Sequence, residues 1–188
     1  KKLASRLAEA ARQKLQEKFT LEQMASQTLK VYDELLNSLN ILVIKISAMG
    51  DVVLVTASLR ALREKYPQAK IYCLVGKESR KVLQNCPYLD GLIIDDTRNK
   101  SKGWLRAVLL SHRLRKYRFD KIVDFQNNRK SHLLSFLSFP RESYGYGNGK
   151  WSSLLTNPLK EYRDDIPAVE HQFQLLHTMG ITPPKDLS

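Results

Sequence analysis

The sequence is poor in the features that mark secreted, membrane-spanning and metal-binding proteins. Only two of its 188 residues are cysteine, Cys73 and Cys86, which is too few for a disulfide framework, and no histidine cluster accompanies them to make a zinc site. No run of 18 apolar residues occurs, so no segment is predicted to cross a membrane. The N-terminal stretch is charged and lacks the apolar core of a signal peptide, so we expect a cytoplasmic protein. The four histidines show no metal-ligand spacing, and no metal is predicted.

Acidic residues are missing from one long segment. Between Thr97 and Phe119 there are eight Lys or Arg residues and no Asp or Glu, in a chain of net charge +12. One interpretation is a solvated helix face. The other is a surface for something anionic, such as phospholipid headgroups, a phosphorylated substrate or nucleic acid. Aromatic residues are few in the segment and no nucleic-acid motif accompanies it, so the sequence favours a small anionic molecule or a membrane surface and no nucleic acid is expected.

Glycine-rich nucleotide motifs are missing too. The stretch SAMGDV has one glycine where the dinucleotide fingerprint needs three, and no P-loop pattern occurs. The glycines of residues 145–149 do not open a helix. No nucleophile elbow and no suggestive Cys–His pair is present. These absences argue against the common nucleotide-cofactor and hydrolase classes.

The chain does contain a regular alternation of strand and helix patterns from Ile41 onward. An apolar, β-branched run over residues 41–46 is followed by an amphipathic helix over 52–66, which Pro67 ends. We predict further strands at 70–75, 91–94, 121–124 and 143–146, and further helices at 78–85, 104–117, 129–137 and 168–179. This alternation predicts an α/β, Rossmann-like, doubly wound parallel sheet of four or five strands. Residues 151–165 look irregular.

The first part of the chain has a different character. Residues 1–18 show a narrow helical stripe, and Thr20 with Gln23 forms a capping-box pattern that predicts the start of a second helix. Residues 1–39 are therefore predicted to be an N-terminal helical extension, which carries no recognisable chemistry. The domain proper is predicted to span residues 40–184.

Asp51 is the candidate functional residue, because it lies where the first strand turns into its helix. In open α/β folds ligands and chemistry gather at such junctions. Gly50 removes a side chain there, the helix N-terminus favours anions, and a carboxylate so placed can act as a general base. The alternative is that Asp51 only stabilises the helix start. From the residues alone, this alternative is favoured.

Three ordered blocks resemble the heptosyltransferase family, glycosyltransferase family 9. The blocks are ILVIKISAMGDVVLVTASLRALREKYPQAKIYCLV, LRKYRFDKIVDFQNNRKSHLLSFLSFPRESYGY and AVEHQFQLLHTMGI. The resemblance implies one half of a GT-B fold, the acceptor-side domain. It implies that Asp51 is the catalytic base, with Ser47, Met49, Gly50 and Gln126 in contact with substrate. It leaves open whether Lys130 holds an acceptor phosphate or is merely a surface lysine.

The same resemblance implies a function. It implies inverting, metal-independent transfer of heptose to an anionic glycolipid acceptor of the Kdo–lipid A type, in lipopolysaccharide core synthesis at the cytoplasmic face of the inner membrane. No cofactor is expected beyond the nucleotide-sugar donor, ADP-heptose, which the family binds mainly in a second domain. That donor domain is missing from the sequence, so this chain alone is expected to be inactive, or else to be part of a longer protein.

Two alternatives stay open. Residues 1–39 resemble the C-terminal tail of family 4 glycosyltransferases, so the chain is either the junction of two fused transferases or a domain with a packed helical extension. The function itself has an alternative from another class, a non-catalytic basic module that binds anionic membrane or nucleic acid.

Overall fold

The computed structural model describes residues 20–37, 39–96, 103–161, 163 and 165–183, together with four isolated positions before residue 20. Contacts divide the chain into two units, residues 1–37 and 38–188. In the first unit, helix α2 (Leu21–Asn37) follows Thr20, whose Oγ1 accepts a hydrogen bond from the Gln23 N–H at 3.2 Å. The predicted cap is therefore confirmed. The predicted helix over residues 1–18 falls almost wholly outside the described residues.

The second unit is built on a sheet of six parallel strands in the order β3-β2-β1-β4-β5-β6. This order is the one typical of Rossmann folds. The apolar run identified from sequence becomes β1, which lies at the centre. The strands are β1 (Asn40–Ile44), β2 (Lys70–Gly76), β3 (Gly91–Asp95), β4 (Lys121–Asp124), β5 (Glu142–Tyr146) and β6 (Asn157–Leu159).

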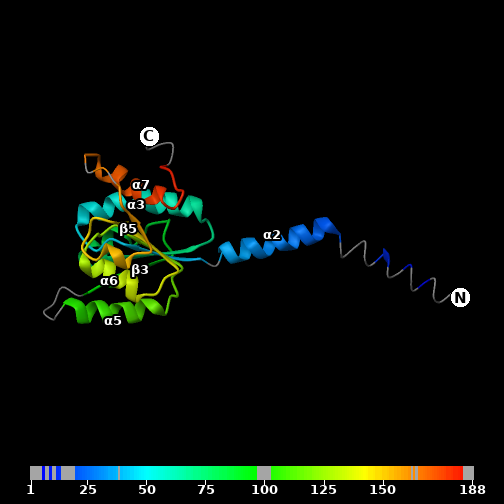
Figure 1. Cartoon of the computed structure of the whole chain (residues 1–188), viewed down its shortest axis with the longest axis horizontal. Coiled ribbons are helices and arrows are strands. Elements are labelled where there is room, and N and C mark those ends of the chain that lie inside the picture. Colours follow the sequence, from blue (N-terminus) through cyan, green and yellow to red (C-terminus); the bar gives the residue numbers. More distant parts are fainter. Residues whose placement is uncertain are drawn as a thin grey trace. The chain divides into compact units, whose positions relative to one another are not determined.

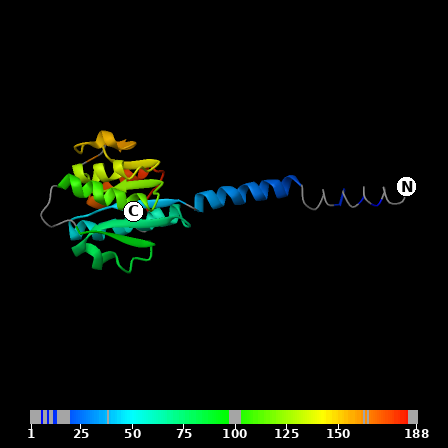
Figure 2. The same cartoon turned by 90° about the horizontal axis from the view of Figure 1, so that it is seen from below.

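Helices cover both faces of this sheet (Figure 1), as a second view confirms (Figure 2). Helices α3 and α7 lie on one face, and α5 and α6 lie on the other. The helices are α3 (Met49–Lys65), α4 (Arg80–Leu83), α5 (Gly103–Arg115), α6 (Arg129–Leu137) and α7 (Ala168–His177), with short 3-10 turns at Lys77–Ser79 and Ser152–Leu154. Among the helices in the described part of the chain, none is long and apolar enough to cross a bilayer.

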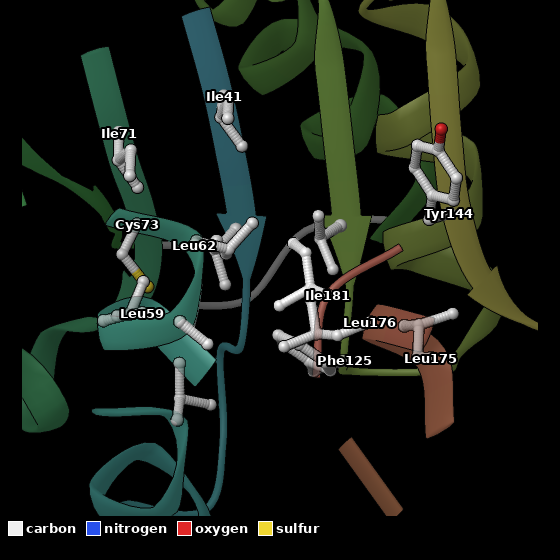
Figure 3. Close-up of a cluster of buried hydrophobic side chains, with 14 of the residues drawn as sticks. Ile41, Leu59, Leu62, Ile71, Cys73, Phe125, Tyr144, Leu175, Leu176 and Ile181 are labelled. Carbon is white, nitrogen blue, oxygen red and sulfur yellow. The ribbon is translucent and has the colours of Figure 1, made fainter. Parts of the chain in front are cut away.

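Alternation along β1 supplies side chains to both cores, because successive residues of a strand point to opposite faces. Ile41 and Val43 join the cluster under α3 and α7, which Figure 3 shows in close-up. Leu42 and Ile44 join the cluster under α5 and α6. All four are fully buried, as expected of a central parallel strand. Cys73 is also fully buried in the first cluster.

The edge of the sheet differs from the prediction. Residues 151–165 contain a sixth strand, β6, which pairs in parallel with β5. Its sequence, Asn-Pro-Leu, has no strand signal, because it is three residues long and proline cannot donate a ladder hydrogen bond. Proline is tolerated at an edge strand, and the pairing comes from the neighbouring strand. The prediction of four or five strands was therefore one strand short.

Candidate functional site

The site lies at the carboxyl edge of the sheet, where β1 and β4 are neighbours. The chain leaves β1 toward α3 on one face and leaves β4 toward α6 on the other. This is the topological switch point, the place where ligands bind in open α/β sheets. The junction singled out from sequence, ending in Asp51, lies at this point.

Asp51 is the third residue of α3, and its side chain is half exposed. The helix N-cap is Ala48, which offers no side-chain cap. The Asp51 carboxylate instead forms an ion pair through Oδ2 with the Nζ of Lys45, at 2.9 Å. The geometry thus argues against Asp51 as the capping residue of this helix.

Lys45 reaches Asp51 because of strand alternation. It follows β1 in phase with Ile41 and Val43, so its side chain leaves on the α3 face. The side chain is only 12% exposed. Its ammonium also lies 3.3 Å from the backbone carbonyl of Phe125, to which it donates a hydrogen bond. Sequence reasoning did not single out Lys45 as a site residue.

Gln126 joins the ends of the two central strands. Its Oε1 accepts hydrogen bonds from the backbone N–H groups of Ile46 at 2.8 Å and Ser47 at 3.0 Å. Its Nε2 lies 3.2 Å from Ser47 Oγ, toward which it donates. One amide side chain therefore holds the turn that presents α3 and Asp51.

A cavity of about 460 Å³ opens beside this turn. It is lined mainly by residues from three regions, the β1–α3 junction, the end of β4 and the start of α7. The lining residues are Lys45, Asp51, Leu54, Phe125, Gln126, Asn127, Tyr146, Ile166, Ala168, His171 and Gln172. The cavity thus combines a carboxylate, an ammonium, amides and an imidazole with an apolar wall, as small-molecule sites do.

His171 is the functional candidate that sequence reasoning missed. Its ring stacks on that of Tyr146, with centroids 4.5 Å apart, and the Tyr146 hydroxyl donates to the His171 carbonyl at 3.1 Å. From sequence it was one of four scattered histidines. The available signal was its position in the first turn of the last helix, but only the tertiary structure places that turn beside Asp51.

The other predicted site residues divide into two groups. Ser47 contacts Gln126, while Met49 and Gly50 form the first turn of α3 with Asp51. Met49 is 52% exposed, and a Cβ added to Gly50 would meet no heavy atom within 4 Å, so this turn is open. Lys130 is absent from the residues that line the Asp51 cavity, and its role stays a prediction.

Lys130 lies at the start of α6, on the other face of the sheet. Its Nζ is 2.5 Å from Oδ2 of Asp95, whose side chain is almost fully buried at the end of β3. Strand phase explains this pairing, because Asp95 follows Ile93, which packs in the cluster under α5 and α6. The lysine ammonium is therefore paired with a protein carboxylate.

A second titratable pair lies behind the cavity. Asp124 and His132 are both fully buried, and Asp124 Oδ2 is 3.6 Å from His132 Nε2. Asp124 Oδ1 accepts the backbone N–H of Gln126 at 2.8 Å and of Asn127 at 3.2 Å. Burial raises the pKa of Asp124 above its ordinary value, although these hydrogen bonds and the nearby histidine oppose the shift. Asp124 therefore fixes the backbone of Gln126, whose side chain holds the turn between β1 and α3.

Metal binding finds no support among the described residues, where no three metal-ligating side chains gather. The predicted metal independence stays a prediction. The Cys73 thiol is not a candidate nucleophile, because burial raises its pKa and it is fully enclosed.

The chain is similar to known proteins both in sequence and in fold. No family model matches the chain. Over 114 residues, it is 26% identical to the lipopolysaccharide core heptosyltransferase OpsX of Haemophilus influenzae, a match that covers 58% of this chain and 32% of the relative. The structure superposes on E. coli ADP-heptose lipopolysaccharide heptosyltransferase II with a TM-score of 0.63 at 26% identity, covering 73% of this chain and 40% of that one. The resemblance to the heptosyltransferases is confirmed.

The fold of this heptosyltransferase-like chain has further support. A glycosyltransferase of family 9 from Veillonella parvula superposes with a TM-score of 0.69 at 20% identity, covering 76% of this chain and 42% of that chain. The Rossmann-like α/β class predicted from sequence is therefore confirmed. The chain spans only about a third to two-fifths of the length of these proteins.

Proposed function

We propose that this chain is the acceptor-side half of a glycosyltransferase of the lipopolysaccharide heptosyltransferase type. One observation carries the proposal: a half-exposed carboxylate, Asp51, lines a cavity at the switch point of the sheet and is held there by an ion pair to Lys45. The identity to two heptosyltransferases supports the choice of reaction.

In this proposal Asp51 acts as general base in an inverting transfer that needs no metal. The ion pair occupies Oδ2, so Oδ1 accepts the proton of the acceptor hydroxyl as its oxygen attacks the anomeric carbon of the donor sugar. The bond from that carbon to the nucleotide diphosphate breaks, and the diphosphate leaves with the electron pair. The donor, proposed to be ADP-heptose, binds in a second domain that faces this edge of the sheet.

The acceptor is proposed to be an anionic glycolipid of the lipopolysaccharide core, presented at the inner membrane. The cavity offers Lys45 and His171 as groups for its acidic substituents and the apolar side chain of Leu54 for a sugar face. Lys130 is proposed only as an outlying contact, because it pairs with Asp95.

The test is sugar transfer by the protein that contains the donor half. Asp51→Asn is expected to lower kcat by a factor of at least about a hundred, the usual contribution of general-base catalysis, with an unchanged melting temperature. Asp96→Asn is the matched control, because Asp96 is an exposed aspartate at the same edge of the sheet. Near-normal turnover by the Asp51 variant would contradict its assignment as the base.

A further inference from the structure

The outer face of α5 exposes several large apolar side chains to solvent. Leu105 is 44% exposed, Val108 41% and Leu109 69%. The opposite side of the same helix is buried in the core through Ala107, Leu110 and Leu114. The exposed apolar residues therefore form a second stripe, which the sheet does not cover.

Basic residues continue this stripe toward the end of the helix. Arg113 and Lys116 are exposed. Arg113 follows Leu109 by one helical turn on α5, and Lys116 lies in the turn that follows the helix. The described part of α5 contains no acidic residue. Asp96, just after β3, lines the same hollow as Leu109 and Arg113. The face is thus apolar in its first half and mainly cationic in its second half.

The end of α6 extends the face. Phe139 is 66% exposed, and the Arg115 guanidinium lies over its ring at 4.4 Å from the centroid. Arg115 Nε also donates to the carbonyl of Leu137 at 2.8 Å, which ties the two helix ends together. Phe136, 46% exposed, lies one turn before Phe139.

The backbone of Phe139 gives a second, independent observation. Its φ is +53°, in the left-handed region that favours glycine or asparagine and disfavours bulky side chains. A large aromatic ring is therefore kept, and kept exposed, at a position where its backbone is strained. Strained residues cluster at functional sites, so the backbone of Phe139 marks it as a candidate for a binding surface.

We propose that this face, formed by Leu105, Val108, Leu109, Arg113, Lys116, Phe136 and Phe139, docks on an anionic lipid bilayer. Exposed Leu and Phe flanked by Arg and Lys is the composition of helices that lie in the membrane interface, with rings and aliphatic groups in the acyl boundary and cations at the headgroups. The thirteen residues of α5 give a contact about 20 Å long.

Charge and apolar character together favour a bilayer over a second copy of the chain or nucleic acid. A second copy of the chain would bring the same cationic face against itself, because symmetric dimers use one patch twice. Nucleic acid would pair with the cations but would leave the Leu and Phe side chains in water. Only an anionic bilayer complements both halves of the face. The proposal also rests on the proposed function, whose glycolipid acceptor is presented at a membrane, and it names the surface that meets that membrane.

The test is vesicle flotation of the full chain with phosphatidylcholine vesicles and with vesicles that contain phosphatidylglycerol. Binding to the anionic vesicles is expected, weakening with salt. Leu109→Gln and Phe139→Asn are each expected to lower the partition coefficient roughly tenfold, because each removes a large apolar group from the interface. Arg113→Gln and Lys116→Gln should each lower it about fivefold at low salt.

Matched controls come from other parts of the same unit. Val53→Gln removes an exposed apolar side chain of α3 on the opposite face, and Lys81→Gln removes an exposed cation. Both are expected to bind vesicles as the original chain does. Asn tolerates a left-handed backbone, so Phe139→Asn should fold, and Leu109→Gln provides a second variant without any backbone change.

Four outcomes would overturn the proposal. The first three are equal binding to neutral and anionic vesicles, full binding by the Leu109 and Phe139 variants, and a dimer in sedimentation that these variants convert to monomer. Preferential binding to an oligonucleotide, unchanged in Leu109→Gln, would assign the face to nucleic acid and also overturn it. Asp51→Asn should bind vesicles normally, so loss of transfer and loss of docking are separate results.

Discussion

Asp124 and His132 form a fully buried pair behind the candidate site. The Nδ1 of His132 lies 3.0 Å from the backbone carbonyl of Lys150, which can only accept, so Nδ1 carries a hydrogen. The other nitrogen faces Asp124 Oδ2, where neither atom has a hydrogen-bond partner. Two acceptors cannot face each other without cost, so one proton belongs between them.

The pH dependence of stability follows from the raised pKa of Asp124. An acid whose pKa is raised by folding contributes stability fully below its unfolded pKa, and this contribution is lost as pH rises through the folded pKa. Asp124→Asn does not ionise, keeps an oxygen for the Gln126 and Asn127 N–H groups, and offers an amide hydrogen to His132. We expect the variant to gain stability relative to the original chain as the pH rises from about 4 to about 8.

Urea unfolding at both pH values measures this difference. Asp124→Ala is the contrasting variant, because it orphans two backbone N–H groups and is expected to cost about 2–5 kcal/mol at either pH. A constant difference between Asp124→Asn and the original chain would mean that Asp124 does not titrate in this range.

Gly50 allows a direct test of substrate approach. A Cβ there meets nothing within 4 Å, and alanine is a better helix former than glycine. Gly50→Ala is therefore expected to keep or raise the melting temperature, while kcat/KM of the complete transferase falls at least about tenfold if the acceptor packs on this backbone. Unchanged kinetics in a stable variant would remove Gly50 from the site. Gly76→Ala should instead destabilise the fold, because its Cβ would lie 2.6 Å from the Ile46 carbonyl oxygen.

At the scale of elements, the turn between β1 and α3 depends on β4. Gln126 reaches across from the end of β4 and satisfies two backbone N–H groups of that turn. Gln126→Ala is expected to lower the free energy of unfolding by about 1–3 kcal/mol. Transfer activity should fall much further, because the helix that carries Asp51 loses its support.

The comparison of urea unfolding with kcat separates these two effects. Gln126→Glu keeps the accepting oxygen and loses the donor to Ser47, so an intermediate loss is expected. Gln84→Ala, at an exposed glutamine after α4, is the control and should change neither quantity. Equal losses of stability and activity in Gln126→Ala would show that Gln126 supports the fold without positioning the site.

At the scale of the whole molecule, the α/β unit contains its own core. Both buried clusters are built from residues between Ile41 and Ile181. The fragment 38–188 is therefore expected to unfold in one cooperative transition, with a midpoint within a few degrees of the full chain. Thermal unfolding followed by circular dichroism checks this. A fragment without a cooperative transition would mean that residues 1–37 complete the core.

Local patterns determined most of the framework. The strand and helix periods predicted β4 and α6 to the residue and most other elements to within three residues, because side-chain alternation is a property of neighbouring positions. Strand β6 was not predicted, because its pairing with β5 is not encoded in its own three residues. The same local switch from strand to helix placed Asp51 at an edge of the sheet.

The residues around Asp51 were decided by tertiary structure alone. Gln126 lies about eighty positions from the turn that it holds, and His171 belongs to the last helix. Neither of these neighbours follows from periodicity, because strand order and helix packing bring them together. The sequence by itself determined the carboxylate and its junction. Only the folded sheet supplied the amide support and the cavity, since each needs side chains from distant segments to meet.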